Sequence, residues 1–281
     1  MRSFFLFSCF YISFLSCNTS SFTQWAGIDK ACTKLLQEKD YLKNFRSKPI
    51  ILKFMDNVHP KIGEKNLEFI QKYYPDLIDK MAKFQKNDSV GNPNTYPYSV
   101  GDFCPATLRY IKIAGDIDER FSHLEKAKIV EIGGGYGGQC RIIKELFPNA
   151  DYTIVDLKEV LLLAKSYLDA FNLDVTFTPV EDIKTEEKYD LVISNFAFSE
   201  CTKEVQDEYL NTLIKNSEHG YMIMYNPFEY KLEYDEYSKV NPMRKKQILG
   251  SFNKISKKVR LEHYLPDYYF YKGDLDYLIT W

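Results

Sequence analysis

Residues 129–138 read IVEIGGGYGG and carry the clearest structural signal in the sequence. Its first four residues are apolar apart from Glu131, as in a buried strand, and five of the chain's 13 glycines follow within Gly133–Gly138. Glycines are needed where the backbone turns sharply and a ligand lies against it without an intervening Cβ. Residues 139–147 then place apolar side chains on one helical face. The stretch therefore predicts a strand, a glycine-rich ligand-binding turn and a helix.

The alternation of strands and helices continues to the end of the chain. Apolar runs predict further strands at 151–155, 175–178, 191–194, 221–225, 258–264 and 277–281. Helical spacing predicts helices at 157–171 and around 205–214. We therefore expect an α/β fold with a mostly parallel sheet and helices on both faces. The charged, tyrosine-rich segment 229–246 is expected to be a surface insertion.

The residues before the glycine turn differ in character. Residues 29–86 have helical spacing, and another helix is expected to begin at Pro105. Between them, residues 88–105 are rich in glycine, asparagine and proline, which predicts a loop. This loop either closes over the ligand crevice as a substrate lid or is a simple connector. We accordingly divide the chain into a hydrophobic leader (1–20), a helical region (21–125) and a cofactor-binding domain (126–281).

The composition is that of a globular protein and excludes several classes of partner and site. Of 281 residues, 45% are hydrophobic, and 37 basic residues face 39 acidic ones. This balance gives no electrostatic reason to expect nucleic acid or an anionic membrane as the main partner. The six cysteines lack the spacing of zinc or iron–sulfur ligands, and a chain of this length needs no disulfide framework. The cysteines downstream of the leader are expected to be buried small hydrophobic residues.

The N-terminus complicates the expected compartment. Residues 4–16 form an uncharged apolar stretch that is too short to span a bilayer comfortably and matches the core of a signal peptide. Residues 14–17 loosely resemble a lipoprotein cleavage site, which would be lipidated at Cys17. Alternatively, the segment packs on the body of the protein, or the start codon is assigned too far upstream. We expect a cytoplasmic protein, because the cofactor proposed below is cytosolic, with anchoring or export through residues 1–17 as the alternative.

An acidic residue follows the second predicted strand. Asp156 lies 19 residues after Gly137, at the carboxyl end of strand 151–155. A carboxylate at this place can accept hydrogen bonds from both hydroxyls of a ribose. This spacing predicts a nucleoside-type cofactor without choosing which one.

Two cofactor fingerprints fit the glycine turn. Gly133, Gly135 and Gly138 satisfy the dinucleotide pattern G-x-G-x-x-G of NAD sites. The same stretch satisfies E-x-G-x-G-x-G, with Glu131 first and Gly137 last. An acid at the end of the first strand would repel a pyrophosphate but suits the ammonium group of S-adenosylmethionine (SAM). Glu131 therefore favours SAM over NAD.

Three more polar residues follow predicted strands. Glu181 or Asp182, after the third strand, could accept the adenine amino group, although either could equally be a solvated loop charge. Asn195 ends the fourth strand, beside the expected methyl group. Because ligands of open parallel sheets bind beyond the carboxyl ends of the strands, these residues are expected to converge with Glu131 and Asp156 on one crevice.

From residue 128 to 281 the chain resembles the class I SAM-dependent methyltransferases. More narrowly, it resembles the sugar O-methyltransferase family of bacterial polysaccharide loci, on the strength of residues 131–138, 194–200, 91–93 and 107–110. The resemblance implies a Rossmann-like sheet of seven strands with the last one antiparallel, and a sugar hydroxyl as the methyl acceptor. The export-like N-terminus departs from this family, which puts the location in doubt more than the activity.

Methyl transfer to a sugar hydroxyl would benefit from a general base, because such a hydroxyl has a high pKa. The candidates are Glu200, just beyond the fourth strand, and His263, near the sixth. Glu200 could instead cap a helix that begins near Thr202, and His263 could be structural. No clustered carboxylates follow Asn195, so we expect no required metal.

Two other functions compete with this interpretation. An NAD-linked sugar oxidoreductase or epimerase would fit the glycines, but Glu131 is the wrong residue for a pyrophosphate. A non-catalytic, anchored binding protein with a methyltransferase-like fold would fit the leader. The expected partner is a small-molecule or glycan acceptor rather than nucleic acid, with a membrane only if the leader is an anchor, and the oligomeric state stays open.

Overall fold

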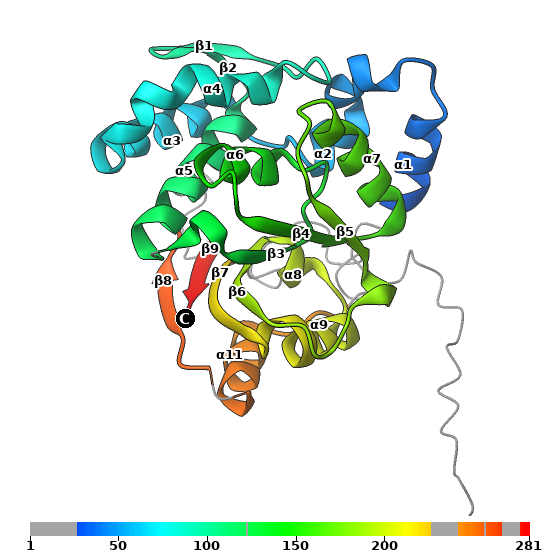
Figure 1. Cartoon of the computed structure of the whole chain (residues 1–281), viewed down its shortest axis with the longest axis vertical. Helices are drawn as coiled ribbons and strands as arrows, with labels where there is room; N and C mark the ends of the chain where they lie inside the picture. The colour runs from blue at the N-terminus through cyan, green and yellow to red at the C-terminus, as the bar shows by residue number, and fades with distance from the viewer. Residues whose placement is uncertain (1–26, 122, 226–240, 256, 266–275) are drawn as a thin grey trace, which may run out of the picture.

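A seven-stranded sheet forms the centre of the protein (Figure 1), whose computed structural model describes residues 27–121, 123–225, 241–255, 257–265 and 276–281. The strands of this sheet are β3 (Lys128–Ile132), β4 (Asp151–Asp156), β5 (Thr176–Pro179), β6 (Tyr189–Asn195), β7 (Ser217–Tyr225), β8 (Arg260–His263) and β9 (Asp276–Thr280). All seven lie where apolar runs predicted strands, and β7 begins four residues earlier than expected.

The order of the strands confirms the predicted fold class. They are hydrogen-bonded in the order β5-β4-β3-β6-β7-β9-β8. The strands from β5 to β7 are parallel, and β9 is antiparallel to both of its neighbours. The order reverses between β3 and β6, and the carboxyl ends of parallel strands at such a reversal are where a ligand crevice forms.

Side chains alternate between the two faces of the sheet, as the period of a strand requires. On β3, Ile129 belongs to one hydrophobic core, whereas Val130 and Ile132 belong to the other. The second core is covered by α8 (Ala197–Glu200), α9 (Lys203–Tyr209), a π-helical turn (Leu210–Ile214) and α11 (Lys245–Lys254). The helix α11 was not predicted from the sequence.

The N-terminal helices cover the first face together with α6 (Gly138–Leu146) and α7 (Lys158–Asp169) (Figure 1). These helices are α1 (Ile28–Leu36), α2 (Pro49–Phe54), α3 (Pro60–Tyr73), α4 (Met81–Gln85) and α5 (Pro105–Arg120). Helix α5 packs on α6, and α1 packs on α7. The helical region therefore shares one continuous core with the sheet.

The segment 88–105 is more ordered than the predicted loop. It contains a small antiparallel hairpin of β1 (Tyr96–Tyr98) and β2 (Gly101–Phe103). The hairpin lies against α3, where the hydroxyl of Tyr98 donates a hydrogen bond to the carbonyl of Pro60 over 3.0 Å. The expectation of a plain loop was wrong, because an extended YPY run can pair with the strand after a tight turn. The role of this segment as a lid stays a prediction.

Several other expectations concern the surface and the ends of the chain. Cys32, Cys104, Cys140 and Cys201 are free and buried, as predicted. The leader and most of segment 229–246 lie outside the described residues. Within the part that the structure describes, no helix combines the length and the apolar character needed to cross a bilayer.

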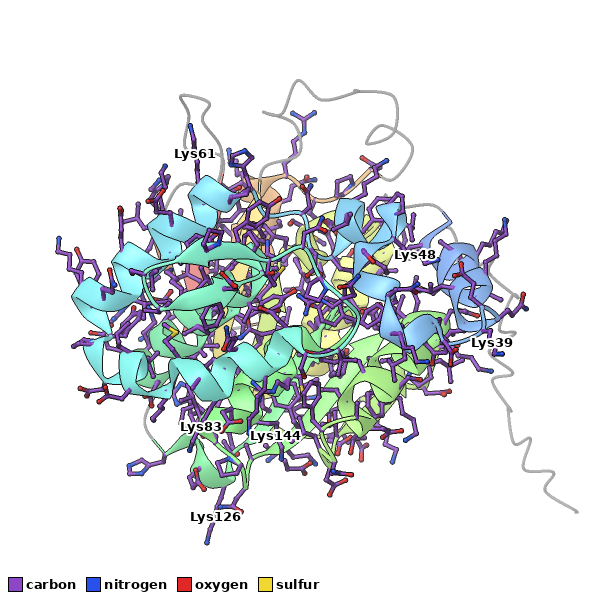
Figure 2. All side chains as sticks on the ribbon, turned by 90° about the horizontal axis from the view of Figure 1, so that it is seen from above. Lys39, Lys48, Lys61, Lys83, Lys126 and Lys144 are labelled. Atoms are coloured by element: carbon purple, nitrogen blue, oxygen red, sulfur yellow. The ribbon has the colours of Figure 1, made fainter. Side chains whose placement is uncertain are left out.

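Lysine side chains are spread over separate elements (Figure 2). Lys39, Lys61, Lys83 and Lys126 are exposed and lie on different helices and turns. Lys144 is the contrasting case, because it is buried and its Nζ donates hydrogen bonds to the carbonyls of Pro148 and Ala150.

Candidate active site

The glycine turn connects β3 to α6 through three residues in the left-handed backbone region. The φ angles of Gly133, Gly135 and Gly137 are 73°, 54° and 90°. At Gly133 a side chain is disfavoured by the φ angle and also by lack of space, because a Cβ there would lie 2.1 Å from the Cβ of Ala197 in α8. The turn therefore approaches α8 closely and presents bare backbone at the carboxyl end of β3.

Asp156 lies at the carboxyl end of β4, as predicted, and is joined to the glycine turn. Its Oδ2 accepts a hydrogen bond from the N–H of Gly135 over 3.0 Å, and its Oδ1 accepts one from the N–H of Leu157 over 2.7 Å. Burial raises the pKa of this carboxyl to about 6, against the opposing effect of the two hydrogen bonds. A carboxylate has about four acceptor positions, so both oxygens can still accept from a ligand hydroxyl.

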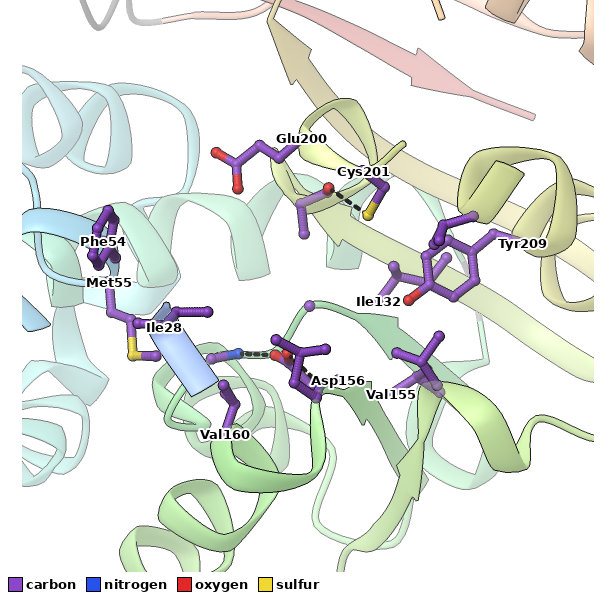
Figure 3. Close-up of a pocket in the computed structure, with 16 residues that line it drawn as sticks. Ile28, Phe54, Met55, Ile132, Val155, Asp156, Val160, Glu200, Cys201 and Tyr209 are labelled. Carbon is purple, nitrogen blue, oxygen red and sulfur yellow. Dashed lines mark hydrogen bonds between the residues drawn. The ribbon is translucent and has the colours of Figure 1, made fainter. Parts of the chain in front are cut away.

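A pocket opens between these two features (Figure 3). Asp156 lies on one side of it and Glu200 on the other, while Phe54 and Met55 close one end and Tyr209 the opposite end. The sixteen lining residues are Ile28, Phe54, Met55, Ile132, Gly133, Gly135, Val155, Asp156, Leu157, Val160, Val180, Ala197, Glu200, Cys201, Val205 and Tyr209. An apolar wall with a few convergent polar groups is typical of a small-molecule site.

Sequence reasoning missed the part of the wall that comes from the N-terminal helices. Ile28 begins α1, and Phe54 and Met55 lie at the end of α2. No local pattern could have marked them, because their place in the pocket depends on how distant helices pack against the sheet. Tyr209 of α9 was likewise predicted only as part of the helix around residues 205–214, although it lines the pocket.

Glu131 does not line the pocket. Its side chain is 2% exposed and accepts a hydrogen bond at Oε2 from the hydroxyl of Tyr152 over 3.0 Å. Burial raises the pKa of this carboxyl to about 8. The side chain extends beneath the turn, where a Cβ at Gly134 would lie 3.2 Å from Oε2. Its predicted contact with a ligand ammonium group stays a prediction.

The remaining predicted cofactor residues lie at the same edge of the sheet but outside the pocket lining. Glu181 and Asp182 are exposed in the turn after β5, next to Val180, which does line the pocket. Asn195 ends β6 and donates a hydrogen bond from Nδ2 to Oε1 of Gln139 over 3.4 Å. Among the described residues its buried Oδ1 has no hydrogen-bond partner, so an acceptor atom is left at the point where the chain turns toward α8.

The two candidate bases are placed differently. Glu200 ends the short helix α8 and lines the pocket, and the helix after it is capped by the side chain of Thr202 rather than by Glu200. His263 is exposed at the end of the outermost strand β8, paired with Tyr277 of β9, and does not line the pocket. Within the described residues no group of three or more histidine, cysteine or acidic side chains is arranged to hold a metal ion.

Part of the chain is similar to known methyltransferases. Residues 130–216 match the family model of a methyltransferase domain. An 83-residue stretch is 31% identical to malonyl-[acyl-carrier protein] O-methyltransferase of Bacillus cereus. The aligned stretch covers 29% of this chain and 31% of that protein. A protein of the same name from Priestia megaterium is 33% identical over 75 residues, 26% of this chain and 27% of its own length. The alignment thus spans less than a third of these curated relatives.

Solved structures give a more distant likeness. A protein from Pyrococcus horikoshii OT3 superimposes on 61% of this chain and 88% of its own, with a TM-score of 0.48 and 14% identity. An O-methyltransferase family protein from Burkholderia thailandensis covers 60% of this chain and 56% of its own, with a TM-score of 0.43 and 12% identity.

The match of residues 130–216 to the family model confirms the predicted methyltransferase domain, and with it SAM as the methyl donor in place of NAD.

Proposed function

We propose that this protein is a SAM-dependent O-methyltransferase and that its acceptor is a neutral hydroxyl, such as that of a sugar in a bacterial glycan or its precursor. The observation that carries the proposal is the presence of Glu200 in the same pocket as Asp156 and the glycine turn. One carboxylate can hold a ribose, and the other can take a proton from the acceptor. The proposal extends the matched domain, residues 130–216, to the activity of the whole chain.

The residues of the pocket fit the cofactor. The bare backbone at Gly133 and Gly135 leaves room for the methionine part, and Asp156 offers acceptors to the ribose. The apolar side chains of Val155, Val180 and other lining residues suit the adenine ring. When bound, SAM would supply an electrophilic methyl group for an oxygen nucleophile, with S-adenosylhomocysteine as the neutral thioether leaving group.

Glu200 is the candidate general base. Its carboxylate can hold the acceptor hydroxyl by accepting a hydrogen bond at Oε, and it can take the proton as the oxygen becomes bonded to carbon. The same negative charge would repel a carboxylate acceptor placed beside it. Position in the pocket thus favours Glu200 over His263, and a neutral acceptor over an anionic one.

A carboxylate acceptor is the second candidate, because the curated relatives are named for malonyl-[acyl-carrier protein]. The free carboxylate of a malonyl thioester would then receive the methyl group. The negative charge of Glu200 in the pocket argues against this acceptor. Removing that charge should slow transfer to a hydroxyl but speed transfer to a carboxylate.

The test combines binding with methyl transfer, using the full chain. Isothermal titration with SAM, S-adenosylhomocysteine and NAD is performed on the wild type, on Asp156→Ala and on Asp151→Ala, a matched exposed aspartate at the start of β4. We expect the first two ligands to bind, and binding to be lost only in Asp156→Ala. Methyl transfer from labelled SAM to sugars but not to malonyl thioesters would support a hydroxyl acceptor.

Other outcomes would select other functions. Transfer to malonyl thioesters alone would establish the carboxylate acceptor. Binding of NAD alone would indicate the oxidoreductase or epimerase, and binding of SAM with no transfer to any acceptor would favour a non-catalytic binding protein.

A further inference from the structure

A buried ion pair lies beneath the glycine turn, in the N-terminal region. Arg46 is fully buried, and its guanidinium contacts Asp56 at two points, with Nε donating to Oδ2 over 2.7 Å and Nη2 donating to Oδ1 over 3.3 Å. Its Nη1 donates to Oδ1 of Asp88 over 3.0 Å and to the carbonyl of Asn87 over 2.9 Å. The guanidinium is therefore held by two carboxylates and one backbone carbonyl.

Tyr136 connects this ion pair to the glycine turn. Its hydroxyl donates a hydrogen bond to Oδ1 of Asp56 over 2.9 Å, and the guanidinium carbon of Arg46 lies 4.9 Å from the centre of its ring. The six residues from Gly133 to Gly138 are five glycines and this one tyrosine. Tyr136 is thus the only side chain through which the rest of the protein can hold the turn.

The residue before Asp56 contacts the turn from the pocket side. Met55 lines the pocket, and a Cβ added to Gly135 would lie 3.7 Å from its Cγ and Sδ atoms. The turn is therefore held between two consecutive residues, with Asp56 bound to Tyr136 and Met55 against Gly135. Since the N–H of Gly135 donates to Asp156, the position of the turn also sets the position of the ribose-binding carboxylate.

We propose that Arg46, Asp56 and Tyr136 form a positioning device for the cofactor-binding turn. Arg46 orients the carboxylate of Asp56, and Asp56 fixes the hydroxyl of Tyr136. Tyr136 keeps Gly135 and Gly137, both in the left-handed region, in the conformation that holds the cofactor. A glycine-rich turn loses more conformational freedom on ordering than other sequences do, so a device that orders it in advance raises affinity. The expected effect on cofactor affinity rests on the proposed function. The expected effect on the order of the turn does not.

The chain offers a matched control for the key side chain. Tyr221 of β7 is also buried, and its hydroxyl also donates to a buried carboxylate, Oδ2 of Asp116. That carboxylate is paired with a buried cation, Lys112, over 2.7 Å. Neither Tyr221 nor Asp116 lines the pocket. Tyr136→Phe and Tyr221→Phe therefore each remove a hydrogen bond to a buried carboxylate that is paired with a cation, one from the turn and one remote from it.

The experiment measures amide hydrogen exchange of residues 133–139 without cofactor, and the dissociation constant for S-adenosylhomocysteine, in the full chain. We expect Tyr136→Phe to speed exchange in the turn and to weaken binding about tenfold, as the loss of one hydrogen bond to a charged group allows. Tyr221→Phe should lower the melting temperature as much as Tyr136→Phe does. It should leave amide exchange in the turn and the dissociation constant at wild-type values.

Two results would overturn the inference. The first is unchanged exchange in the turn of Tyr136→Phe, which decides the matter even if the wild type binds no S-adenosylhomocysteine. The second is an equal loss of affinity in both variants, which would show that Tyr136 acts only through general stability. Failure of the proposed function is seen separately, as absence of binding by the wild type.

Discussion

The backbone N–H of Gly135 donates a hydrogen bond to Oδ2 of Asp156 over 3.0 Å, and this contact joins the turn after β3 to the carboxyl end of β4. The carboxylate has two functions as a result. It fixes the shape of the turn, and it faces the pocket as an acceptor for a ligand. The charge of Asp156 therefore affects both the shape of the turn and the affinity for a ligand.

We expect cofactor affinity to fall in acid because of Asp156. Burial raises its pKa to about 6, so the folded protein without ligand carries an ionised carboxylate above that pH and a neutral carboxyl below it. The ionised form is the stronger acceptor for ribose hydroxyls. Affinity for S-adenosylhomocysteine should be constant above about pH 7 and decrease as the pH falls through about 6. Titration calorimetry across this range measures it.

Two variants separate this effect from general acid sensitivity. Asp156→Asn should bind weakly at every pH, with the pH dependence removed. Asp151→Asn, at the exposed start of β4, should keep the wild-type profile. A wild-type affinity that stays flat down to about pH 5 would contradict the role given to Asp156.

Glu131 should make the stability of the protein depend on pH in the opposite sense to an ordinary acid. Burial raises its pKa from 4.5 to about 8, so between these values the folded state retains a proton that the unfolded state has lost. Stability due to this group is therefore complete below about pH 4.5, falls as the pH rises toward 8, and is constant above. Glu131→Gln should remove that decrease.

Denaturant unfolding at a series of pH values checks this prediction. The control is Glu186→Gln, a substitution at an exposed position before β6. If Glu131→Gln and the wild type lose stability in parallel as the pH rises from about 5 to 8, then Glu131 is ionised in the folded protein, and the case for its contact with a ligand ammonium is strengthened.

Much of the fold was predictable from the sequence, because its signals are local. The glycine turn, the seven apolar runs and the position of Asp156 at a strand end follow from residues close together in the chain. The orientation of Glu131 was also within reach. Side chains alternate along a strand, so if Ile132 faces the pocket, Glu131 points to the opposite face.

The rest of the site depends on tertiary packing. Nothing near Phe54 or Met55 in the sequence indicates that α2 ends beside the glycine turn. The same holds for Arg46, which reads as an ordinary surface charge until Asp56 and residues 87–88 enclose it. The hairpin in residues 96–103 was missed because Pro97 and Gly101 suit a loop and a short strand pair equally.

Glu200→Gln should separate chemistry from cofactor binding. The amide keeps the size of the side chain but cannot take a proton, so we expect the rate of methyl transfer to fall about a hundredfold or more while affinity for S-adenosylhomocysteine is retained. Single-turnover rates and titration calorimetry measure the two quantities. The matched control is Glu204→Gln, an exposed position in the first turn of α9, which should change neither.

The result also discriminates between the two acceptors and the two bases. An increase in the rate with malonyl thioesters in Glu200→Gln would favour the carboxylate acceptor, because a repelling charge has been removed. A wild-type rate in Glu200→Gln together with a large loss in His263→Gln would move the general base to β8.

Two glycine-to-alanine substitutions should have opposite effects on stability. At Gly250 in α11 nothing lies within 4 Å of the place that a Cβ would take, and the position is helical, so Gly250→Ala should stabilise the protein by about 0.5–1 kcal/mol. At Gly133 the φ of 73° strains any L-residue, and the Cβ would collide with Ala197. Gly133→Ala should therefore destabilise the protein by about 1–3 kcal/mol.

Cofactor binding distinguishes these two positions further. Gly133→Ala pushes α8 away from the turn, so it should abolish binding of S-adenosylhomocysteine even at temperatures where the variant is fully folded by circular dichroism. Gly250→Ala should bind as the wild type does, since α11 contributes no residue to the pocket lining. A folded Gly133→Ala that binds with wild-type affinity would show that the close approach of the turn to α8 is not needed for the cofactor site.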